Sequence, residues 1–202
     1  MKSQSTEGRG KAVWGGRITL AVALLGVASA ASCSKAMRTG QSPNYLIIES
    51  LQGASGGSLQ SDVLNRNPTT GATSIAADLG TAAIRLAQKD PLGPAPSVAN
   101  AITITQYRVE YIRSDGRNVQ GVDVPFSFDG AVTATVFDAA TVPFTLVRVQ
   151  AKQEAPLAAL AFSGGANTIT TVARVTFYGR DQNGREVSVS GNMEVTFSDW
   201  AG

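Results

Sequence analysis

The sequence predicts an all-β fold, and two observations support that prediction. The stretches 168–179 and 187–197 alternate apolar and polar residues with a period of two, which is typical of strands with one buried and one solvated face. Extended runs recur from residue 102 onward, separated by turn dipeptides such as Asp115-Gly116 and Asn183-Gly184. Several short strands divided by turn signals indicate a sandwich or barrel.

Strand signals are weaker between residues 44 and 101. The stretch 44–50 is rich in β-branched and aromatic residues and is the first expected strand. Glycine, serine, asparagine and threonine dominate residues 51–73, which predicts loops or short strands, for example near 59–64. Residues 74–88 fit either a helix or a strand. Because Gly80 disfavours a helix, we expect a strand over 80–88, followed by a proline-rich loop.

The middle of the chain predicts extended runs within 102–119, on either side of the Asp115-Gly116 turn, and further extended segments at 122–128, 130–136 and 140–152. Proline cannot donate to a hydrogen-bond ladder, so Pro125 and Pro143 belong at strand starts, edges or bulges.

Residues 153–167 interrupt this pattern. We expect Pro156 to open a single helical turn there, with Leu157 and Leu160 on one side and two glycines at its end.

The last two predicted strands form a hairpin over residues 173–197. Ala173, Val175 and Phe177 occupy one face of the first strand, and Tyr178 lies on the opposite, polar face. The hairpin resembles the last two strands of bacterial immunoglobulin-like domains, over about residues 102–198. That resemblance implies an immunoglobulin-like antiparallel β-sandwich, which we expect to occupy residues 44–202 as a single domain.

The N-terminus has the layout of a secretory signal peptide. Four basic residues and one acidic residue lie within the first 17, and a mostly apolar run of 14 residues follows at 18–31. A membrane-spanning helix needs about 20 apolar residues, so this run is too short to cross a bilayer. It ends in small residues, as a cleavage site requires. We therefore assign residues 1–32 to a signal peptide.

Cys33 is the only cysteine in the chain, and it comes directly after this apolar run. The segment Ala30-Ala31-Ser32-Cys33 resembles the lipobox of bacterial lipoproteins. In that family the cysteine thiol receives a diacylglyceryl group, and cleavage then makes the cysteine the first residue. The resemblance implies that fatty chains such as palmitate anchor the protein at Cys33. An ordinary signal cleaved near Ala31 and an uncleaved anchor are the alternatives.

The predicted anchor implies a cellular compartment, and it implies a tether between the membrane and the folded domain. We expect a cell-envelope lipoprotein, which in a Gram-negative cell is held at the outer membrane, facing the periplasm or the cell surface. Residues 33–43 contain little apolar surface and form the expected flexible tether. Beyond residue 32 the chain has 13 basic and 14 acidic residues. No basic excess remains there to indicate a nucleic-acid partner.

Catalytic machinery is not apparent in the sequence, so we expect no enzyme activity. The chain has no histidine, which excludes Ser-His-Asp and Cys-His arrangements and metal sites that depend on histidine. Lys89 and Lys152 do not follow a serine at Ser-x-x-Lys spacing, and Lys35 follows only Ser32, which belongs to the predicted signal peptide, so we expect all three lysines to be solvated. The expected cofactor and metal content is none. The candidate acids for glycosidic chemistry are Asp115, Asp123, Asp129, Asp138 and Asp181. All but Asp123 lie beside glycine, alanine or turn residues and are better explained as turn residues.

The remaining functional candidates are aromatic and apolar side chains. Most aromatic residues fall at alternate strand positions and are expected in the core. Tyr178 and Trp200 are the expected exposed pair. The apolar loop containing Leu157, Leu160 and Phe162 either covers the core or touches a partner, and core cover is favoured. We expect a non-catalytic binding or structural module with an envelope-protein partner. The alternative is a small-ligand or carbohydrate binder using surface aromatics.

Overall fold

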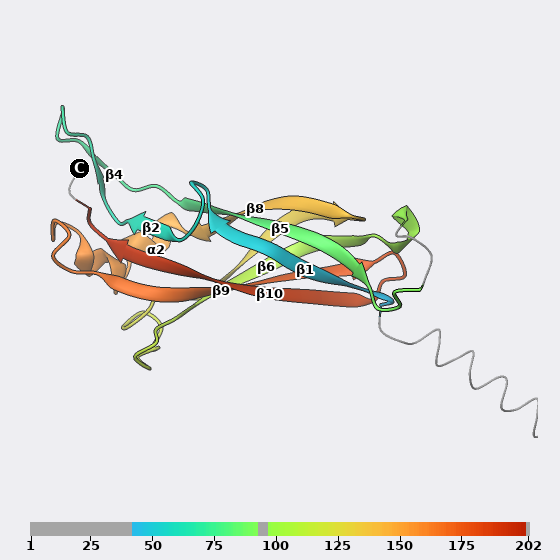
Figure 1. The fold of residues 1–202 in the computed structure, drawn as a ribbon. Coiled ribbons are helices and arrows are strands. Elements are labelled where there is room, and N and C mark those ends of the chain that lie inside the picture. The colour runs from blue at the N-terminus through green and yellow to red at the C-terminus, as the bar shows by residue number, and fades with distance from the viewer. Residues whose placement is uncertain (1–41, 93–96, 201–202) are drawn as a thin grey trace, which may run out of the picture. The chain divides into compact units, whose positions relative to one another are not determined.

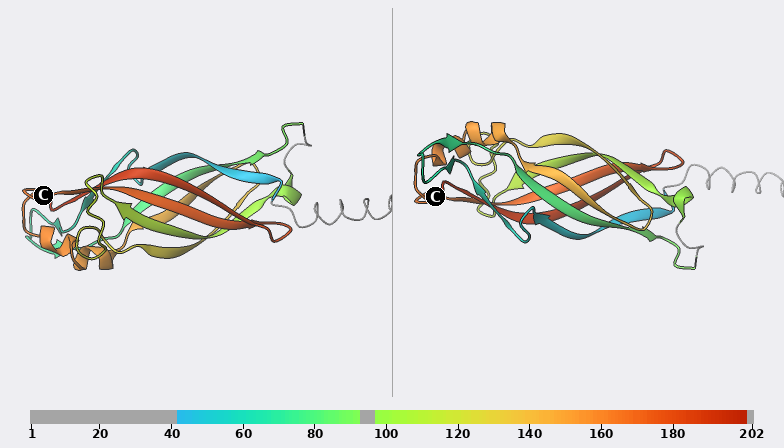
Figure 2. Two further views of the ribbon diagram at one scale, coloured as in Figure 1. Left: turned by 90° about the horizontal axis from the view of Figure 1, so that it is seen from below. Right: turned by 90° about the horizontal axis from the view of Figure 1, so that it is seen from above.

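The computed structural model describes residues 42–92 and 97–200 (Figure 1), which belong to one compact unit that starts at Ser42. The predicted signal peptide, Cys33 and all but the last residues of the predicted tether lie outside these described residues. Two β-sheets packed face to face dominate the unit (Figure 2). The predicted all-β antiparallel sandwich is therefore confirmed, while its immunoglobulin-like assignment stays a prediction.

The smaller sheet has three antiparallel strands in the order β1-β5-β8. They are β1 (Asn44–Gly53), β5 (Asp78–Gln88) and β8 (Ala139–Val147). The strand expected over 80–88 is thus confirmed and its helical alternative is wrong. Ala82, Ile84 and Leu86 are all buried on one face of β5. Burial at every second position is available to a strand and not to a helix.

The larger sheet has five strands in the order β2-β10-β9-β6-β7. They are β2 (Leu59–Asp62), β10 (Glu186–Ser198), β9 (Ile169–Asp181), β6 (Ile102–Ile112) and β7 (Phe128–Val136). The pairing of β2 with β10 is parallel, and the other pairings in this sheet are antiparallel. A two-stranded ribbon of β3 (Asn65–Arg66) and β4 (Thr73–Ser74) lies outside both sheets.

The core lies between the two sheets and is rich in aromatic rings. Tyr107 and Phe177 of the larger sheet both pack against Phe144 of the smaller sheet, with ring centroids 5.6 and 5.4 Å from it. Of the eight aromatic residues in the predicted strands from residue 102 onward, six are buried, which confirms the expectation that most lie in the core. The two exposed ones are Phe126 and Tyr178.

One predicted strand segment is wrong, and another ends earlier than expected. Residues 122–127 form a turn and irregular structure, and only Phe128 joins a strand: Gly121 has a φ of +76°, and the carboxylate of Asp123 accepts a hydrogen bond from the Val119 N–H at 3.1 Å. The segment expected over 140–152 leaves the sheet at Val147 and continues as the short helix α2 (Val149–Gln153). In both segments, hydrogen bonds within a turn or a helix take the place of the strand-to-strand hydrogen bonds that the apolar residues predicted.

Other local predictions are confirmed. Pro143 lies within β8, an edge strand of its sheet, where a missing N–H does not break a central ladder. The predicted helical turn after Pro156 is present as the 3₁₀-helix η2 (Leu157–Leu160), and both leucines are buried.

The strand register defines two ends of the sandwich, which we call the proximal end and the distal end. At the proximal end the start of β1 pairs with the end of β5, and the start of β6 pairs with the ends of β7 and β9. The described chain also begins at this end, and the 3₁₀-helix η1 (Val98–Asn100) lies here. The distal end carries α2, η2, the β3–β4 ribbon and residues 113–127 (Figure 1).

Candidate functional site

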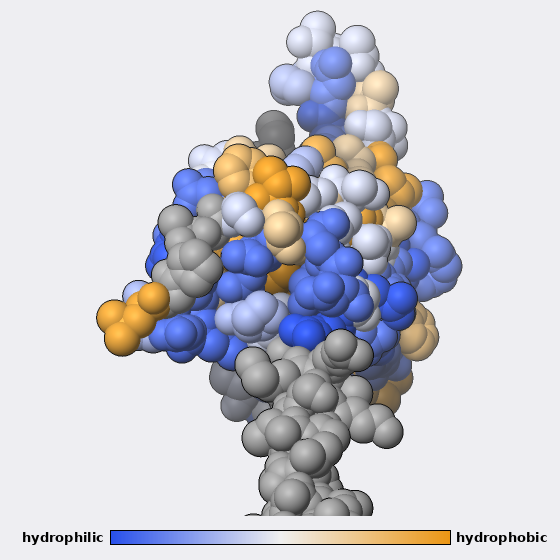
Figure 3. Space-filling model, turned by 90° about the vertical axis from the view of Figure 1, so that its right-hand side faces the viewer, coloured by the Kyte–Doolittle hydropathy of each residue, from blue (hydrophilic) through white to orange (hydrophobic). Residues whose placement is uncertain are grey.

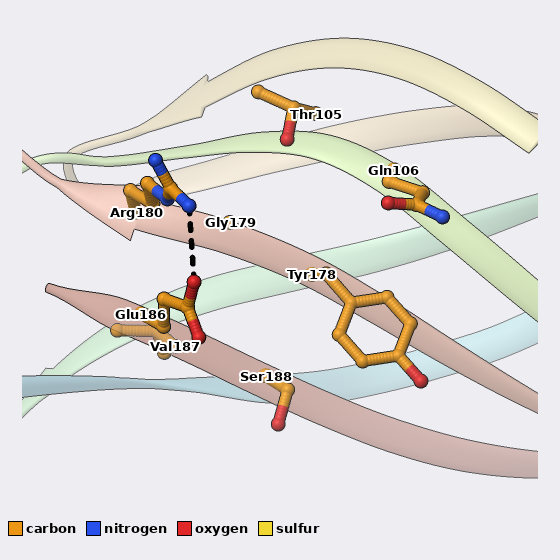
Figure 4. Close-up of a pocket in the computed structure, with 8 residues that line it drawn as sticks. All are labelled: Thr105, Gln106, Tyr178, Gly179, Arg180, Glu186, Val187 and Ser188. Atoms are coloured by element: carbon orange, nitrogen blue, oxygen red, sulfur yellow. Dashed lines mark hydrogen bonds and ion pairs between the residues drawn. The ribbon is translucent and has the colours of Figure 1, made fainter. Parts of the chain in front are cut away.

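A hollow of about 510 Å³ lies on the outer face of the five-stranded sheet, and we call it the Tyr178 groove (Figure 4). Three neighbouring strands, β6, β9 and β10, supply its lining. The lining residues are Thr105, Gln106, Tyr178, Gly179, Arg180, Glu186, Val187 and Ser188. Outward-facing positions of these strands are solvated, so the groove opens to water.

A β-bulge in β6 shapes the groove. Ile104 pairs with Gly179 and Gln106 with Tyr178, so Thr105 is the extra residue on its strand. The backbones come close here: a Cβ built on Gly179 would lie 2.5 Å from the carbonyl oxygen of Thr103. Glycine is the one residue that fits at position 179 without a clash. A β-bulge commonly changes the direction in which neighbouring side chains point. The sequence pattern alone gave no sign of the bulge.

The chemistry of the groove is aromatic and polar. The Tyr178 side chain is 38% exposed, and Ser188 faces it directly across the β9–β10 pair. Arg180 and Glu186 form an ion pair with an N···O distance of 3.0 Å at the neighbouring cross-strand position (Figure 4). Glu186 is the one carboxylate among the lining residues, so they do not contain the two acids that glycosidic hydrolysis requires.

The two aromatic residues singled out in the sequence do not form one surface. Tyr178 lies near the proximal end, opposite the start of β10, whereas Trp200 follows the end of that strand. Trp200 is also half-buried, with its indole Nε1 inaccessible and its backbone N–H bonded to Asp62 Oδ1 at 3.3 Å. The expected exposed pair is therefore wrong for Trp200. The chain end folds back beside β2, a contact that its sequence does not signal.

The residues of the apolar loop at the distal end have two different roles. Leu157 and Leu160 are 0% and 5% exposed and close the core, as the favoured interpretation of this loop predicts. Phe162 is 72% exposed. It also has a φ of +62°, in the left-handed region that residues with a Cβ rarely adopt. The guanidinium carbon of Arg66 lies 5.8 Å from the centre of the Phe162 ring.

Four of the five aspartates considered for catalysis have evident structural partners. Asp181 accepts the backbone N–H groups of Asn183 and Arg185 in the hairpin turn, as expected of a turn residue. Hydrogen bonds from Arg113 above all, and from Arg117, hold the pKa of the exposed Asp115 carboxyl well below its usual range. Asp123 accepts from a turn N–H, and Asp129 pairs with Arg108 at 3.0 Å.

Lys152 is not solvated, which corrects the sequence prediction. Its side chain is 1% exposed, and its ammonium lies 3.0 Å from Asp78 Oδ2 and 2.7 Å from the Asp62 carbonyl oxygen. The hydroxyl of Ser61, a fully buried residue, donates to the same Asp78 oxygen at 2.6 Å. The prediction placed Lys152 at the end of a strand, but the turn into α2 points it inward. Because Ser61 is inaccessible to a substrate, the cluster is structural.

Comparisons with known proteins identify no relative: no family model matches the chain, and no curated protein matches it. Within residues 42–92 and 97–200, none of the helices combines the length and the apolar content needed to span a bilayer. The same described residues contain no group of three or more His, Cys, Asp or Glu side chains placed to hold a metal ion.

Proposed function

We propose that this protein is a lipid-anchored lipoprotein of the bacterial cell envelope whose β-sandwich is a non-catalytic binding module. The anchor is Cys33, and its support is the basic start, the short apolar run and the small residues before a single cysteine. The described domain begins nine residues later, at Ser42. That spacing suits a tether that joins a folded module to a membrane.

One observation carries the binding part of the proposal. Phe162 is exposed, and its backbone holds a left-handed conformation that is unfavourable for a residue with a Cβ. A left-handed φ costs a non-glycine residue about 1–2 kcal/mol. Surrounding structure maintains such a conformation, and strained residues of this kind cluster at functional sites. Phe162 lies at the distal end, beside Arg66. Phenylalanine and arginine are both enriched at protein–protein interfaces, so the proposed partner is an envelope protein.

The anchor is tested by mass spectrometry of the mature N-terminus. The expected first residue is Cys33 carrying fatty acyl chains, and growth with labelled palmitate should label the protein. Cys33→Ser should abolish both the labelling and processing at that position. An unmodified N-terminus at Ala31 or Ser32 would refute the lipoprotein assignment.

The binding surface is tested by photocrosslinking in the native cell, with a photoreactive phenylalanine at position 162. A matched variant carries the same residue at Val172, which is also exposed but lies on the outer face of β9 and not in the loop that carries Phe162. We expect a discrete crosslinked product at 162 that is missing at 172 and weakened by Arg66→Ala. Equal products at both positions would contradict a binding surface at Phe162.

The Tyr178 groove supports a second candidate function, the binding of a small polar ligand such as a saccharide. An exposed aromatic ring beside a hydroxyl and an arginine–carboxylate pair can stack on a sugar face and hydrogen-bond its hydroxyls. A glycan array probed with the mature protein tests this function. Binding should be lost in Tyr178→Ala and kept in Trp200→Ala, because only Tyr178 lines the groove. A flat array would remove this candidate.

A further inference from the structure

The proximal end of the sandwich exposes large apolar side chains that its fold does not use. Leu92 is 94% exposed, Val98 is 75%, Phe137 is 53% and Tyr45 is 42%. They come from four separate places in the chain: the loop after β5, the helix η1, the link between β7 and β8, and β1.

The register brings these four positions to one end of the domain. Tyr45 pairs with Ala87 near the end of β5, just before Leu92. Phe137 follows Val136, which pairs with Ile102, and Val98 lies just before that strand. Two hydrogen bonds link the same segments: Lys89 N–H to the Pro43 carbonyl at 2.9 Å, and the Asn44 amide to the Asn100 carbonyl at 2.9 Å. Figure 3, which views this end, shows hydrophobic side chains at its margin among hydrophilic ones.

From this arrangement we infer that the proximal end rests on the lipid surface, with Leu92, Val98 and Phe137 inserted at the headgroup level. This inference rests on the proposed anchor at Cys33. The described chain starts at this same end, so the nine residues from Ser34 to Ser42 join it directly to the acylated cysteine. A tether of that length, if flexible as the sequence predicts, would span about 15–18 Å on average.

The reach of the tether selects this end over the other. The distal end also exposes apolar side chains, Val119, Val122 and Phe162 among them. It lies one strand length away, which for strands such as the 13-residue β9 is roughly 40 Å. Nine residues reach at most about 32 Å when fully extended. The distal end therefore cannot dip end-on into the membrane that holds Cys33, which leaves it available to a protein partner.

The charges at the proximal end indicate a neutral lipid surface. Cationic and anionic side chains are nearly balanced there, and Arg180 pairs with Glu186 at 3.0 Å. The ionisable residues of this end are Lys89, Asp90, Asp138, Arg180, Asp181, Arg185 and Glu186. Such a surface has no excess of positive charge to attract anionic lipids, so apolar insertion supplies the attraction. Tyr45 adds a residue type enriched at membrane–water interfaces.

Fluorescence from single labels in the full acylated chain tests this inference. Cys33 is consumed as a thioether, so a thiol-reactive environment-sensitive dye attaches only to a cysteine introduced by Leu92→Cys or Phe137→Cys. Val122→Cys at the distal end is the matched control, because Val122 is 67% exposed. Each labelled chain is reconstituted into phosphatidylcholine vesicles and floated on a density gradient.

The expected result is a blue shift and quenching by spin-labelled lipid at positions 92 and 137, at depths of about 5–10 Å, with neither at 122. If the chain floats with the vesicles while all three labels behave alike, the docking is overturned and the anchor stands. If the chain does not float at all, both the anchor and the docking that rests on it are overturned.

Discussion

The ammonium group of Lys152 lies 3.0 Å from the Asp78 carboxylate, and this buried ion pair joins the two sheets at the distal end. Lys152 follows the last strand of the smaller sheet and Asp78 opens its central strand. The same two side chains bond Ser61 and Asp62 on β2, in the larger sheet. A polar cluster thus replaces apolar packing where β2, β5 and α2 meet.

Removal of the Lys152 charge should destabilise the domain strongly. Lys152→Met keeps most of the side-chain volume but leaves the Asp78 carboxylate without its cation, which costs about 3 kcal/mol when the pair is buried. Urea unfolding of the mature chain measures the loss. Lys152→Met/Asp78→Leu should cost less than the two single changes together, because the partners are coupled. A loss below about 1 kcal/mol would place Lys152 among solvated ion pairs.

Gly179→Ala should destabilise the sheet at the bulge. The added methyl would lie 2.5 Å from the Thr103 carbonyl oxygen, a backbone atom that cannot move alone, so the expected cost is about 2–3 kcal/mol. Gly191→Ala is the matched control. Its methyl would meet the Cδ1 atom of Ile48 at 3.0 Å, the tip of a side chain that can rotate away. Equal unfolding midpoints for the two variants would contradict a tight backbone contact at Gly179.

Tyr111 should make the domain sensitive to alkali. Burial raises the pKa of its phenol far above the ordinary value, and its hydroxyl donates to the Leu146 carbonyl oxygen at 2.6 Å. The unfolded chain releases this proton near pH 10 and the folded chain retains it. Stability from this group is therefore complete below about pH 10 and falls as the pH rises further.

Tyr111→Phe removes this titration and the hydrogen bond. At pH 7 the variant should be about 1 kcal/mol less stable, because the Leu146 carbonyl loses its partner. Between about pH 10 and 12 its stability should decline less steeply than that of the parent chain. Urea unfolding across this range measures both slopes, and parallel slopes would show that Tyr111 is not the responsible group.

Replacement of Phe162 should separate stability from binding. Asparagine tolerates a left-handed φ, so Phe162→Asn should raise stability by about 0.5 kcal/mol while it weakens crosslinking to the partner. Phe162→Ala retains the backbone penalty and should lose binding without any gain in stability. Thermal unfolding gives the first quantity and the photocrosslinked yield the second. A destabilised Phe162→Asn would mean that the ring contributes to packing.

The elements that sequence predicted well are those whose residues alternate over a long run. In β9 and β10 the inward side chains, Val175, Phe177, Val195 and Phe197, are fully buried, and the turn at Asn183-Gly184 is where the dipeptide indicated. The strand predicted over 122–128 is absent up to residue 127 because Pro125 and the preceding Gly121 divert a β-rich run into turns. Among the residues that line the Tyr178 groove, only Tyr178 was predictable, because the alternation already placed it on the polar face of its strand.

The residue pattern alone specifies that this chain builds strands with one apolar face, because a period of two leaves a strand no other way to bury those residues. The pattern also specifies which residue types are available for chemistry. Packing of the two sheets was needed to establish that Lys152 is buried, that Trp200 and Tyr178 lie apart, and that Leu92, Val98 and Phe137 share one end. Those outcomes depend on which strands become neighbours and in what register, which is a property of the packed sheets and not of any local stretch.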